Sequence, residues 1–358
     1  MVRRIEFWRG ILIAACLIML TPALAIACSC MFSPNTCSID WKKGELVFLG
    51  KVTTKEPIRD ADGAQSFPTR VAVHFSVTET LRGAINSDKE TVIFTGAGGG
   101  DCGYPFIVGQ TYLVYASTYQ DQLTTSICTQ TRPVGMAAAL IRQLRAKRKS
   151  SDQPTLFGMI GTAAKGVGYE ELVESKGLAR VRVRAIGSAG PDHSTTSDTE
   201  GVYAFDWLPA DTYRLEIDLP QGLSTWQHNT GKPFVVHVGN TEESRGCSLD
   251  VFARPDGRVS GTIVDLAGKN VAGFITIKPS DPIEAEAASR RGGLPGFTSQ
   301  DGKFTLWQIP PGTYRLVFYP IVNGQVNLRS GFGSKPIEIA FGEQIENYRF
   351  TVPINPPQ

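Results

Sequence analysis

One segment of this chain occurs twice. Residues 200–215 match residues 301–316, and the identical positions are 101 residues apart: Gly201 and Gly302, Pro209 and Pro310, Tyr213-Arg214-Leu215 and Tyr314-Arg315-Leu316. An earlier pair, Gly161-Thr162 and Gly261-Thr262, fits a separation of 100 residues. A repeat of about 100 residues has the size of one domain. We therefore predict two homologous domains in tandem, over 155–252 and 253–352.

The repeated segment has the pattern of paired β-strands. An acid–glycine pair forms a turn that tolerates positive φ, and the alternation of Tyr203 with Phe205, and of Phe304 with Leu306, buries one face of the following strand. A Pro-containing turn then leads into the next strand. Short alternating strands between Gly and Pro turns predict a β-sandwich. The first copy has Asp211 where the second has Gly312, and aspartate tolerates the turn less easily.

This repeated core, of the form dG.y.f..lp.G.Y.l, resembles the carboxypeptidase regulatory-like domain, a transthyretin-like sandwich with a carbohydrate-binding-like fold. The resemblance implies the fold and little about function. Related sandwiches include starch-binding modules, which stack sugars on exposed aromatic rings. The corresponding candidates here are Trp207 and Trp307, at equivalent repeat positions, with Trp226 and Tyr319 as further aromatics. Packing at the edge of the sandwich is the alternative role for these rings.

The first residues predict export. Arg3, Arg4 and Arg9 precede an apolar run over 11–20, and small residues follow. This is the order of a cleavable signal peptide, which we place at 1–27. Cleavage after Ala27 would make Cys28 the first mature residue, whereas cleavage after Ala25 would leave Ile26 there. The mature protein is then secreted or periplasmic, or a lipoprotein anchored through Cys28, although lipoprotein signals usually have Leu at the position of Ala25.

Net charge and the length of apolar segments limit the classes of partner that the chain can have. The whole chain has 36 basic and 34 acidic residues, and loss of the signal removes three arginines and one glutamate, which leaves a balanced charge. We expect no attraction to nucleic acid. No mature stretch reaches the roughly 20 apolar residues of a transmembrane helix. The basic run 142–149 is explained by the end of a helix predicted over 134–147 and a linker over 147–154.

Six cysteines follow the signal: Cys28, Cys30, Cys37, Cys102, Cys128 and Cys247. An even count in an exported chain indicates disulfides. Paired C-x2-C spacings, which zinc sites prefer, are absent, so we predict no metal site. Five of the six precede residue 130, so the N-terminal domain, predicted over 28–148, carries most of the cross-links.

This N-terminal domain combines strand-like runs with a C-terminal helix. The runs are 46–52, 71–80, 90–95 and 111–115, and the domain begins with the C-x-C of Cys28 and Cys30. The pattern resembles the netrin-like OB-fold of the tissue inhibitors of metalloproteinases. The overall prediction is an all-β chain: an OB-fold barrel with a C-terminal helix, followed by two tandem β-sandwiches.

The resemblance implies that Cys28 pairs with Cys102 and Cys30 with Cys128. Cys37 either pairs with Cys247 or stays free. In the inhibitors, the α-amine and carbonyl of the first cysteine chelate the zinc of a protease, and a hydroxyl at the second residue lies by the catalytic acid. Cys28 and Ser29 are the matching residues here. The alternative is that the C-x-C only cross-links an OB-fold with another use.

We find no catalytic motif. The four histidines form no H-E-x-x-H, and neither G-x-S-x-G nor a P-loop occurs. Gly96 to Gly100 is interpreted as a flexible loop, and His74 as a solvent-facing strand residue. We therefore expect a non-enzymatic, cofactor-free binding protein. Its partner is either a zinc protease, bound through Cys28, or a polysaccharide or cell-envelope component, bound by the sandwiches.

Overall fold

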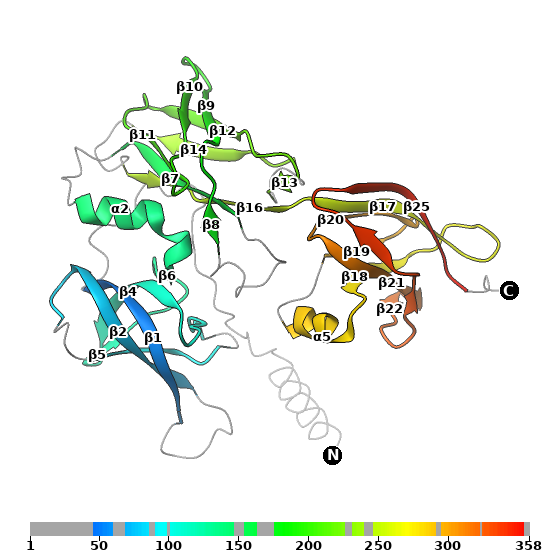
Figure 1. Cartoon of the computed structure of the whole chain (residues 1–358), viewed down its shortest axis with the longest axis horizontal. Coiled ribbons are helices and arrows are strands. Elements are labelled where there is room, and N and C mark those ends of the chain that lie inside the picture. The colour runs from blue at the N-terminus through cyan, green and yellow to red at the C-terminus, as the bar shows by residue number, and fades with distance from the viewer. Residues whose placement is uncertain are drawn as a thin grey trace, which may run out of the picture.

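The computed structural model describes most of the chain from residue 46 onward, over residues 46–59, 69–85, 90–98, 101–146, 154–162, 175–225, 231–239, 246–290, 295–322 and 324–353. The predicted signal peptide, Cys28, Ser29, Cys30, Cys37, Trp226 and most of the predicted linker lie outside these ranges. The all-β prediction is confirmed: a barrel with a short helix is followed by two β-sandwiches (Figure 1). Among the described residues, no helix is long and apolar enough to cross a lipid bilayer.

The N-terminal body is a closed five-stranded barrel. Its hydrogen-bonded order is β1-β2-β3-β5-β4, and β4 pairs back with β1. All these pairs are antiparallel except β3 with β5. This closed arrangement matches the OB-fold class of small barrels. The strands are β1 (Leu46–Ile58), β2 (Arg70–Arg82), β3 (Thr91–Gly96), β4 (Thr111–Tyr119) and β5 (Gln122–Thr124), and the short β6 (Arg132–Pro133) extends the sheet beyond β4.

Aromatic rings fill the barrel. Phe75 meets Phe48 and Phe106 edge-on, with centroids 5.5 and 5.1 Å apart. Phe106 also meets Tyr112 at 4.9 Å, and the Tyr112 hydroxyl accepts a hydrogen bond of 3.0 Å from the Ile107 amide. Edge-to-face contacts add to the burial of large apolar area. β1 and β4 are buried on both faces, because one face lines the barrel and the other belongs to a second hydrophobic cluster.

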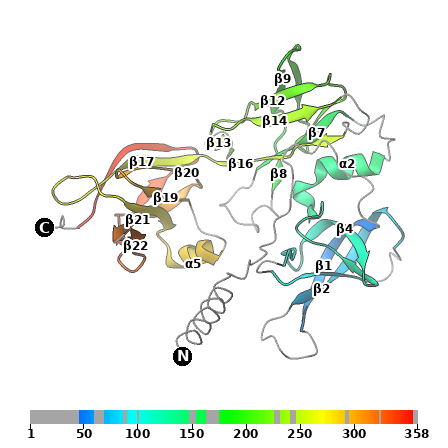
Figure 2. The ribbon, with the colours of Figure 1, turned by 180° about the vertical axis from the view of Figure 1, so that it is seen from behind.

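A helix joins the barrel to the first sandwich. It comprises η1 (Val134–Met136) and α2 (Ala138–Ala146), within the predicted helical segment. Leu140 and Leu144 belong to one buried cluster with barrel residues such as Leu113 and sandwich residues such as Phe157 and Met159. Figures 1 and 2 show α2 between the two bodies from opposite sides. Barrel and first sandwich therefore share a hydrophobic core.

The first sandwich packs two sheets face to face. One sheet has the order β10-β9-β12-β14, and the other β11-β7-β16-β13, with β8 and β15 paired to β7. Its core includes Tyr203, Tyr213 and Leu215. The strands are β7 (Leu156–Thr162), β8 (Lys176–Gly177), β9 (Arg182–Gly187), β10 (His193–Thr196), β11 (Val202–Phe205), β12 (Asp211–Ile217), β13 (Leu223–Ser224), β14 (Phe234–Val238), β15 (Cys247–Ser248) and β16 (Val251–Pro255).

The second sandwich repeats this arrangement. Its sheets are β20-β17-β25 and β19-β18-β21-β22, with β23 and β24 also paired to β21. Parallel pairing of β17 with β25 corresponds to that of β7 with β16. The elements are β17 (Gly257–Val264), β18 (Gly273–Pro279), α5 (Pro282–Arg290), β19 (Gly296–Ser299), β20 (Lys303–Ile309), β21 (Gly312–Val322), β22 (Gln325–Val326), β23 (Phe332–Gly333), β24 (Ile337–Ile339) and β25 (Gln344–Thr351).

Strand pairing corrects the start of the repeat. Tyr203 lies opposite Gly158, and its counterpart Phe304 lies opposite Gly261. Gly158 is therefore the counterpart of Gly261, and the match of Gly161-Thr162 with Gly261-Thr262 is wrong by three residues. Both glycines are needed for close approach: a Cβ at Gly158 would lie 1.9 Å from the Leu249 carbonyl oxygen, and one at Gly261 1.8 Å from that of Tyr348.

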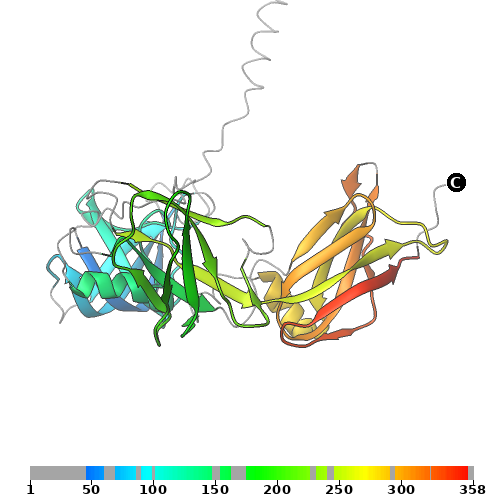
Figure 3. The same ribbon diagram turned by 90° about the horizontal axis from the view of Figure 1, so that it is seen from above.

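The two sandwiches follow each other almost without interruption. Only Asp256 separates β16 from β17, and these strands run as one ribbon between the bodies in Figure 3. The Asp256 carboxylate accepts a hydrogen bond of 2.8 Å from the Ser224 hydroxyl. From the second sandwich, Gln308 donates to the Ser224 carbonyl at 3.3 Å. These contacts orient one sandwich on the other. The predicted boundary after residue 252 falls inside β16.

Candidate functional site

Two of the predicted disulfide residues lie side by side on the barrel. The Cys102 and Cys128 sulfurs are 4.0 Å apart, about twice the length of a disulfide bond, so these two are not bonded to each other. The Ile127 amide donates to the Cys102 carbonyl at 3.0 Å and holds the two segments together. Each cysteine is half of a disulfide. The predicted partners Cys28 and Cys30 lie outside the described residues, so these pairings stay predictions.

The glycine-rich segment before Cys102 is organised by an aspartate that sequence reasoning missed. The Asp101 carboxylate accepts hydrogen bonds from the amides of Ala97, Gly98 and Gly103 at 2.7 to 2.9 Å. An aspartate in a Gly-rich turn is a known signal for such local side-chain to backbone bonds. In its described part, the predicted flexible loop is therefore a fixed turn that positions Cys102.

Cys247 lies apart from the other two. It is on β15 in the core of the first sandwich, with 2% of its surface exposed, and it too is half of a disulfide. The predicted partner, Cys37, is outside the described residues. A buried disulfide half in this core is protected from reductants, because exchange needs access to the sulfur.

The tryptophan candidates differ in exposure. Trp207 lies in the loop between β11 and β12 and is 61% exposed, whereas Trp307, on β20, is half-buried. The 101-residue separation of the repeat places Gln308, not Trp307, at the position of Trp207, so the prediction that the two tryptophans are equivalent is wrong by one residue. Of the other aromatics considered, Tyr319 lies on β21 and is half-buried.

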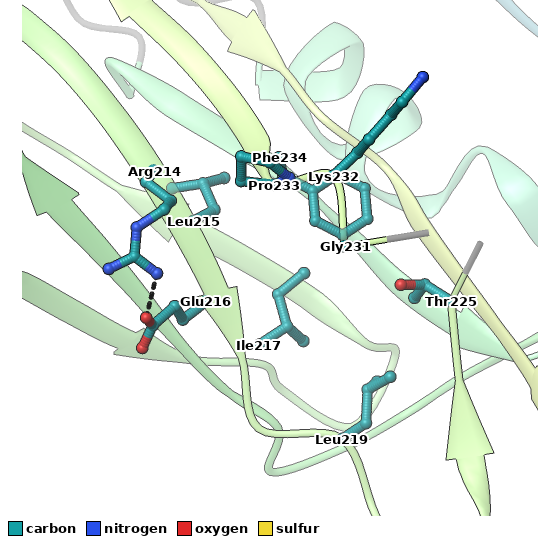
Figure 4. A pocket seen from close by; sticks show the side chains of 10 residues that line it. All are labelled: Arg214, Leu215, Glu216, Ile217, Leu219, Thr225, Gly231, Lys232, Pro233 and Phe234. Atoms are coloured by element: carbon teal, nitrogen blue, oxygen red, sulfur yellow. Dashed lines mark hydrogen bonds and ion pairs between the residues drawn. The ribbon is translucent and has the colours of Figure 1, made fainter. Parts of the chain in front are cut away.

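A concave site is found in the first sandwich, at the end of β12 remote from Trp207. Its volume is about 430 Å³, and Figure 4 shows the side chains around it. Ile217 and the Phe234 ring face its centre, and Lys232 extends outward from the rim. The lining residues are Arg214, Leu215, Glu216, Ile217, Leu219, Thr225, Gly231, Lys232, Pro233 and Phe234. Trp207 precedes the other end of β12, about 20 Å away at the usual strand rise, so it is not part of this cavity.

A charged pair borders the cavity. Arg214 donates to one oxygen of Glu216, and Arg184 of the adjacent β9 contacts the other. The hydrogen bond from Arg214 and the charge of both arginines lower the pKa of Glu216, so it is ionised at neutral pH. The Lys232 ammonium makes no ion pair with the residues that the structure describes. The cavity thus combines an apolar floor with a polar rim that carries a slight positive excess.

The histidines give no catalytic or metal centre in the described part of the chain. The prediction that His74 faces solvent is wrong. Its side chain is only 19% exposed and lies 3.2 Å from Glu90 and 3.7 Å from Glu56. Glu56 lies on β1, His74 on β2 and Glu90 directly before β3. Because the pairing of these strands brings the three residues together, the neighbours could not be found from local alternation. No group of three metal-ligating side chains occurs among the described residues.

Comparison with known proteins does not identify a family. No protein-family model matches the chain, and no curated protein matches it. Among solved structures, a streptococcal ancillary pilin is 12% identical, with 86% of this chain and 92% of that chain covered at a TM-score of 0.23. A Pseudomonas aeruginosa putative carbohydrate-binding protein is 16% identical, with 27% of this chain and 88% of that chain covered at a TM-score of 0.19.

A third solved structure, the Bacillus anthracis TIE protein, is 17% identical at a TM-score of 0.23. The match covers 55% of this chain, which spans 33% of the length of that protein. None of these three structures is described as a metalloprotease inhibitor. At such TM-scores the likeness carries no functional argument, so function has to be argued from the described residues themselves.

Proposed function

We propose that this exported protein binds cell-envelope glycans without catalysis, through the cavity of its first sandwich. The observation that carries the proposal is the combination in one concave site of an aromatic ring, Phe234, aliphatic side chains and a fixed Arg214–Glu216 pair. Its volume of about 430 Å³ falls within the range of small-molecule sites. The ring and the aliphatic floor suit the apolar face of a sugar, and the charged pair suits its hydroxyl groups.

Removal of the ring tests this proposal. In affinity gel electrophoresis with peptidoglycan fragments and neutral polysaccharides, Phe234→Ala should weaken retention at least tenfold, and Arg214→Gln by a smaller factor. Tyr119, an aromatic on the barrel that is 65% exposed, supplies the control Tyr119→Ala, which should leave retention unchanged. Equal retention of Phe234→Ala and the wild type, or retention on no glycan at all, would contradict the proposal.

The exposed Trp207 is proposed as a separate glycan contact. It lies outside the cavity, so Trp207→Ala should lower the affinity for long polymers and leave that for short fragments unchanged. Trp307 is half-buried and is expected to contribute less. A loss of affinity for short fragments in Trp207→Ala would instead place this ring in the main site.

A second function is favoured by the adjacent Cys102 and Cys128 sulfurs. Two disulfides that start from neighbouring residues of a C-x-C segment would end side by side, as these sulfurs do. Such pairing would fix the N-terminus on the barrel. If cleavage occurs before Cys28, its α-amine, with an ordinary pKa near 8, would be free to coordinate the zinc of a metalloprotease, with Ser29 beside it.

N-terminal sequencing of the mature protein decides this second function. A free Cys28 should be accompanied by inhibition of a panel of zinc proteases, and one added N-terminal Ala should abolish the inhibition. A chain that begins at Ile26, or an acylated Cys28, removes the chelating amine and rules the mechanism out. Neither outcome affects glycan binding by the sandwich.

A further inference from the structure

We infer that the outer face of the sheet β19-β18-β21 in the second sandwich binds acidic polysaccharides. This inference rests on the proposed function only in assigning glycan binding to a sandwich, because it concerns a different body and different residues. Inward residues of β18 and β21, such as Ile275 and Phe318, fill the core. The alternate residues, which include Phe274 and Tyr319, occupy the outer face of the sheet.

Two aromatic rings lie next to each other on this face. Phe274 and Tyr319 lie directly opposite each other on β18 and β21. Their ring centroids are 6.3 Å apart and their planes differ by 31°, so the rings lie side by side. Aromatic faces carry negative charge density, which attracts the weakly positive C–H groups on the apolar face of a pyranose. Two adjacent rings therefore provide stacking positions for neighbouring sugars.

Each ring occupies the space beside a glycine of a neighbouring segment. A Cβ at Gly296 on β19 would lie 2.4 Å from the Phe274 ring, and one at Gly331 would lie 2.7 Å from the Tyr319 ring. Each ring thus covers a residue without a side chain on a neighbouring segment, as in aromatic rescue of glycine in sheets. The same packing holds each ring in one orientation, so little side-chain entropy remains to be lost on binding.

Two cations lie on the same face. Lys278 and Arg315 are directly opposite each other in the register of β18 and β21, and both are exposed. Like charges directly opposite each other destabilise a sheet. Neither forms an ion pair with a carboxylate in the described part of the chain. This includes Glu338 of β24, which lies opposite Thr313 of β21. An anionic ligand would relieve this repulsion.

Hydrogen bonds hold both cations in place. The Lys278 ammonium donates to the Tyr319 hydroxyl at 3.1 Å and lies 5.8 Å from the ring centroid. Together these distances place it beyond the hydroxyl, near the long axis of the ring, so the ammonium does not cover the ring face. Arg315 donates to the Ser334 carbonyl at 3.1 Å and keeps further N–H groups for a carboxylate. Rings and cations together match a sugar that carries an acidic group.

Polygalacturonate and its methyl ester test the inference with the full-length protein, because they share a backbone and differ in charge. In affinity gel electrophoresis at 0.15 M salt, polygalacturonate should retain the wild type and the ester should bind at least tenfold more weakly. Phe274→Leu and Tyr319→Leu keep apolar cover over the glycines but lose the flat ring, and each should weaken binding at least tenfold. Tyr319→Phe keeps the ring and should change binding less than threefold.

The charge variants complete the test. Lys278→Gln with Arg315→Gln should lower affinity for polygalacturonate to that for the ester. A matched pair of exposed lysines elsewhere in this sandwich, Lys269→Gln with Lys303→Gln, should leave it unchanged. Polyphosphate, which has no sugar rings, should bind weakly and be insensitive to Tyr319→Leu; sensitivity equal to that for polygalacturonate would overturn the stacking role.

The outcomes separate this inference from the proposed function. Equal binding of polygalacturonate and its ester, or ring variants that behave like Tyr119→Ala, would overturn the inference. If Phe234→Ala then still abolishes retention on neutral glycans, the proposed function stands alone. If polygalacturonate binding depends on Phe274 and Tyr319 while Phe234→Ala is without effect on any glycan, the inference stands and the cavity is not the site.

Discussion

The Arg132 guanidinium of the barrel donates a hydrogen bond of 2.6 Å to the Asp250 carboxylate of the first sandwich. Their side chains are only 25% and 12% exposed. The second Asp250 oxygen accepts from the Met159 amide at 2.8 Å. Because β6 and the segment before β16 supply the two charges, the pair exists only when the barrel and the sandwich are packed together. It therefore links the stability of the two bodies.

Burial of the Asp250 carboxyl makes this stability dependent on pH. Burial raises the pKa of the Asp250 carboxyl above its ordinary value near 3.8, and Arg132 and the Met159 amide oppose the rise only in part. Between the ordinary and the raised value, the folded state binds more protons than the unfolded state. The contribution of Asp250 to stability is thus largest below the ordinary value and declines as the pH rises through the folded pKa.

Two substitutions check this prediction by urea unfolding at several pH values. Arg132→Met leaves a buried carboxylate unpaired and should cost about 3 kcal/mol at pH 7, with a smaller cost at acid pH, where Asp250 is protonated. Asp250→Asn keeps an acceptor for the Met159 amide and should reduce the pH dependence. A pH dependence of the unfolding free energy that is the same in Asp250→Asn and in the wild type would contradict the raised pKa.

Helix α2 should stabilise both neighbouring bodies through its apolar face. Leu140 is 2% exposed in the core that spans barrel and sandwich. Leu140→Ala should lower the free energy of unfolding by about 2–5 kcal/mol, and hydrogen exchange should speed up in β4 and β7 together. The control is Arg142→Ala: its ion pairs with Asp198 and Glu200 are exposed and contribute about 1 kcal/mol or less. Faster exchange in only one body would show that the two fold independently.

The corrected repeat register predicts equal roles for Gly158 and Gly261. An alanine at either position would force its Cβ against a carbonyl of the adjacent parallel segment, so both substitutions should cost about 3 kcal/mol. At Gly190 and Gly333, a Cβ would have no atom within 4 Å other than those of the glycine and its two chain neighbours. Alanine at these two positions should change the free energy of unfolding by about 0.5 kcal/mol. Thermal unfolding measures all four. If Gly158→Ala leaves the melting temperature unchanged while Gly261→Ala lowers it, the match of Gly158 with Gly261 is contradicted, and Gly161 becomes the candidate counterpart again.

The cysteine pairings predict a defined pattern of free thiols. Cys102→Ser should release one reactive thiol at Cys28, and Cys128→Ser should release one at Cys30, which maleimide labelling and peptide mapping locate. Loss of either cross-link should cost up to about 5 kcal/mol, because each closes a long loop. Cys247→Ser should likewise release a reactive thiol at Cys37 if these two cysteines are paired. A thiol released at any other cysteine would refute the corresponding pair.

Much of the fold was predictable because it depends on local patterns. Alternating residues such as Tyr203 and Phe205 identify strands, and acid–glycine turns separate them. Both patterns occur in each copy of the repeated segment. The candidate sites were less predictable. Trp207 lies in a loop and is mostly exposed, whereas Trp307 lies one residue before the counterpart of Trp207, on β20, and is half-buried. Asp101 was missed, although its place in a glycine-rich turn was a usable signal.

The class of each body follows from hydrophobic alternation and turn residues, since these patterns act over a few positions and do not depend on which strands are partners. How the bodies join and what their surfaces present depend on contacts between residues far apart in the chain. The Arg132–Asp250 pair follows from the packing of the barrel on the sandwich. The counterpart of Gly261 and the pairing of Phe274 with Tyr319 follow from strand register. Register is set by long-range packing, and a period of two residues does not encode which strand lies opposite.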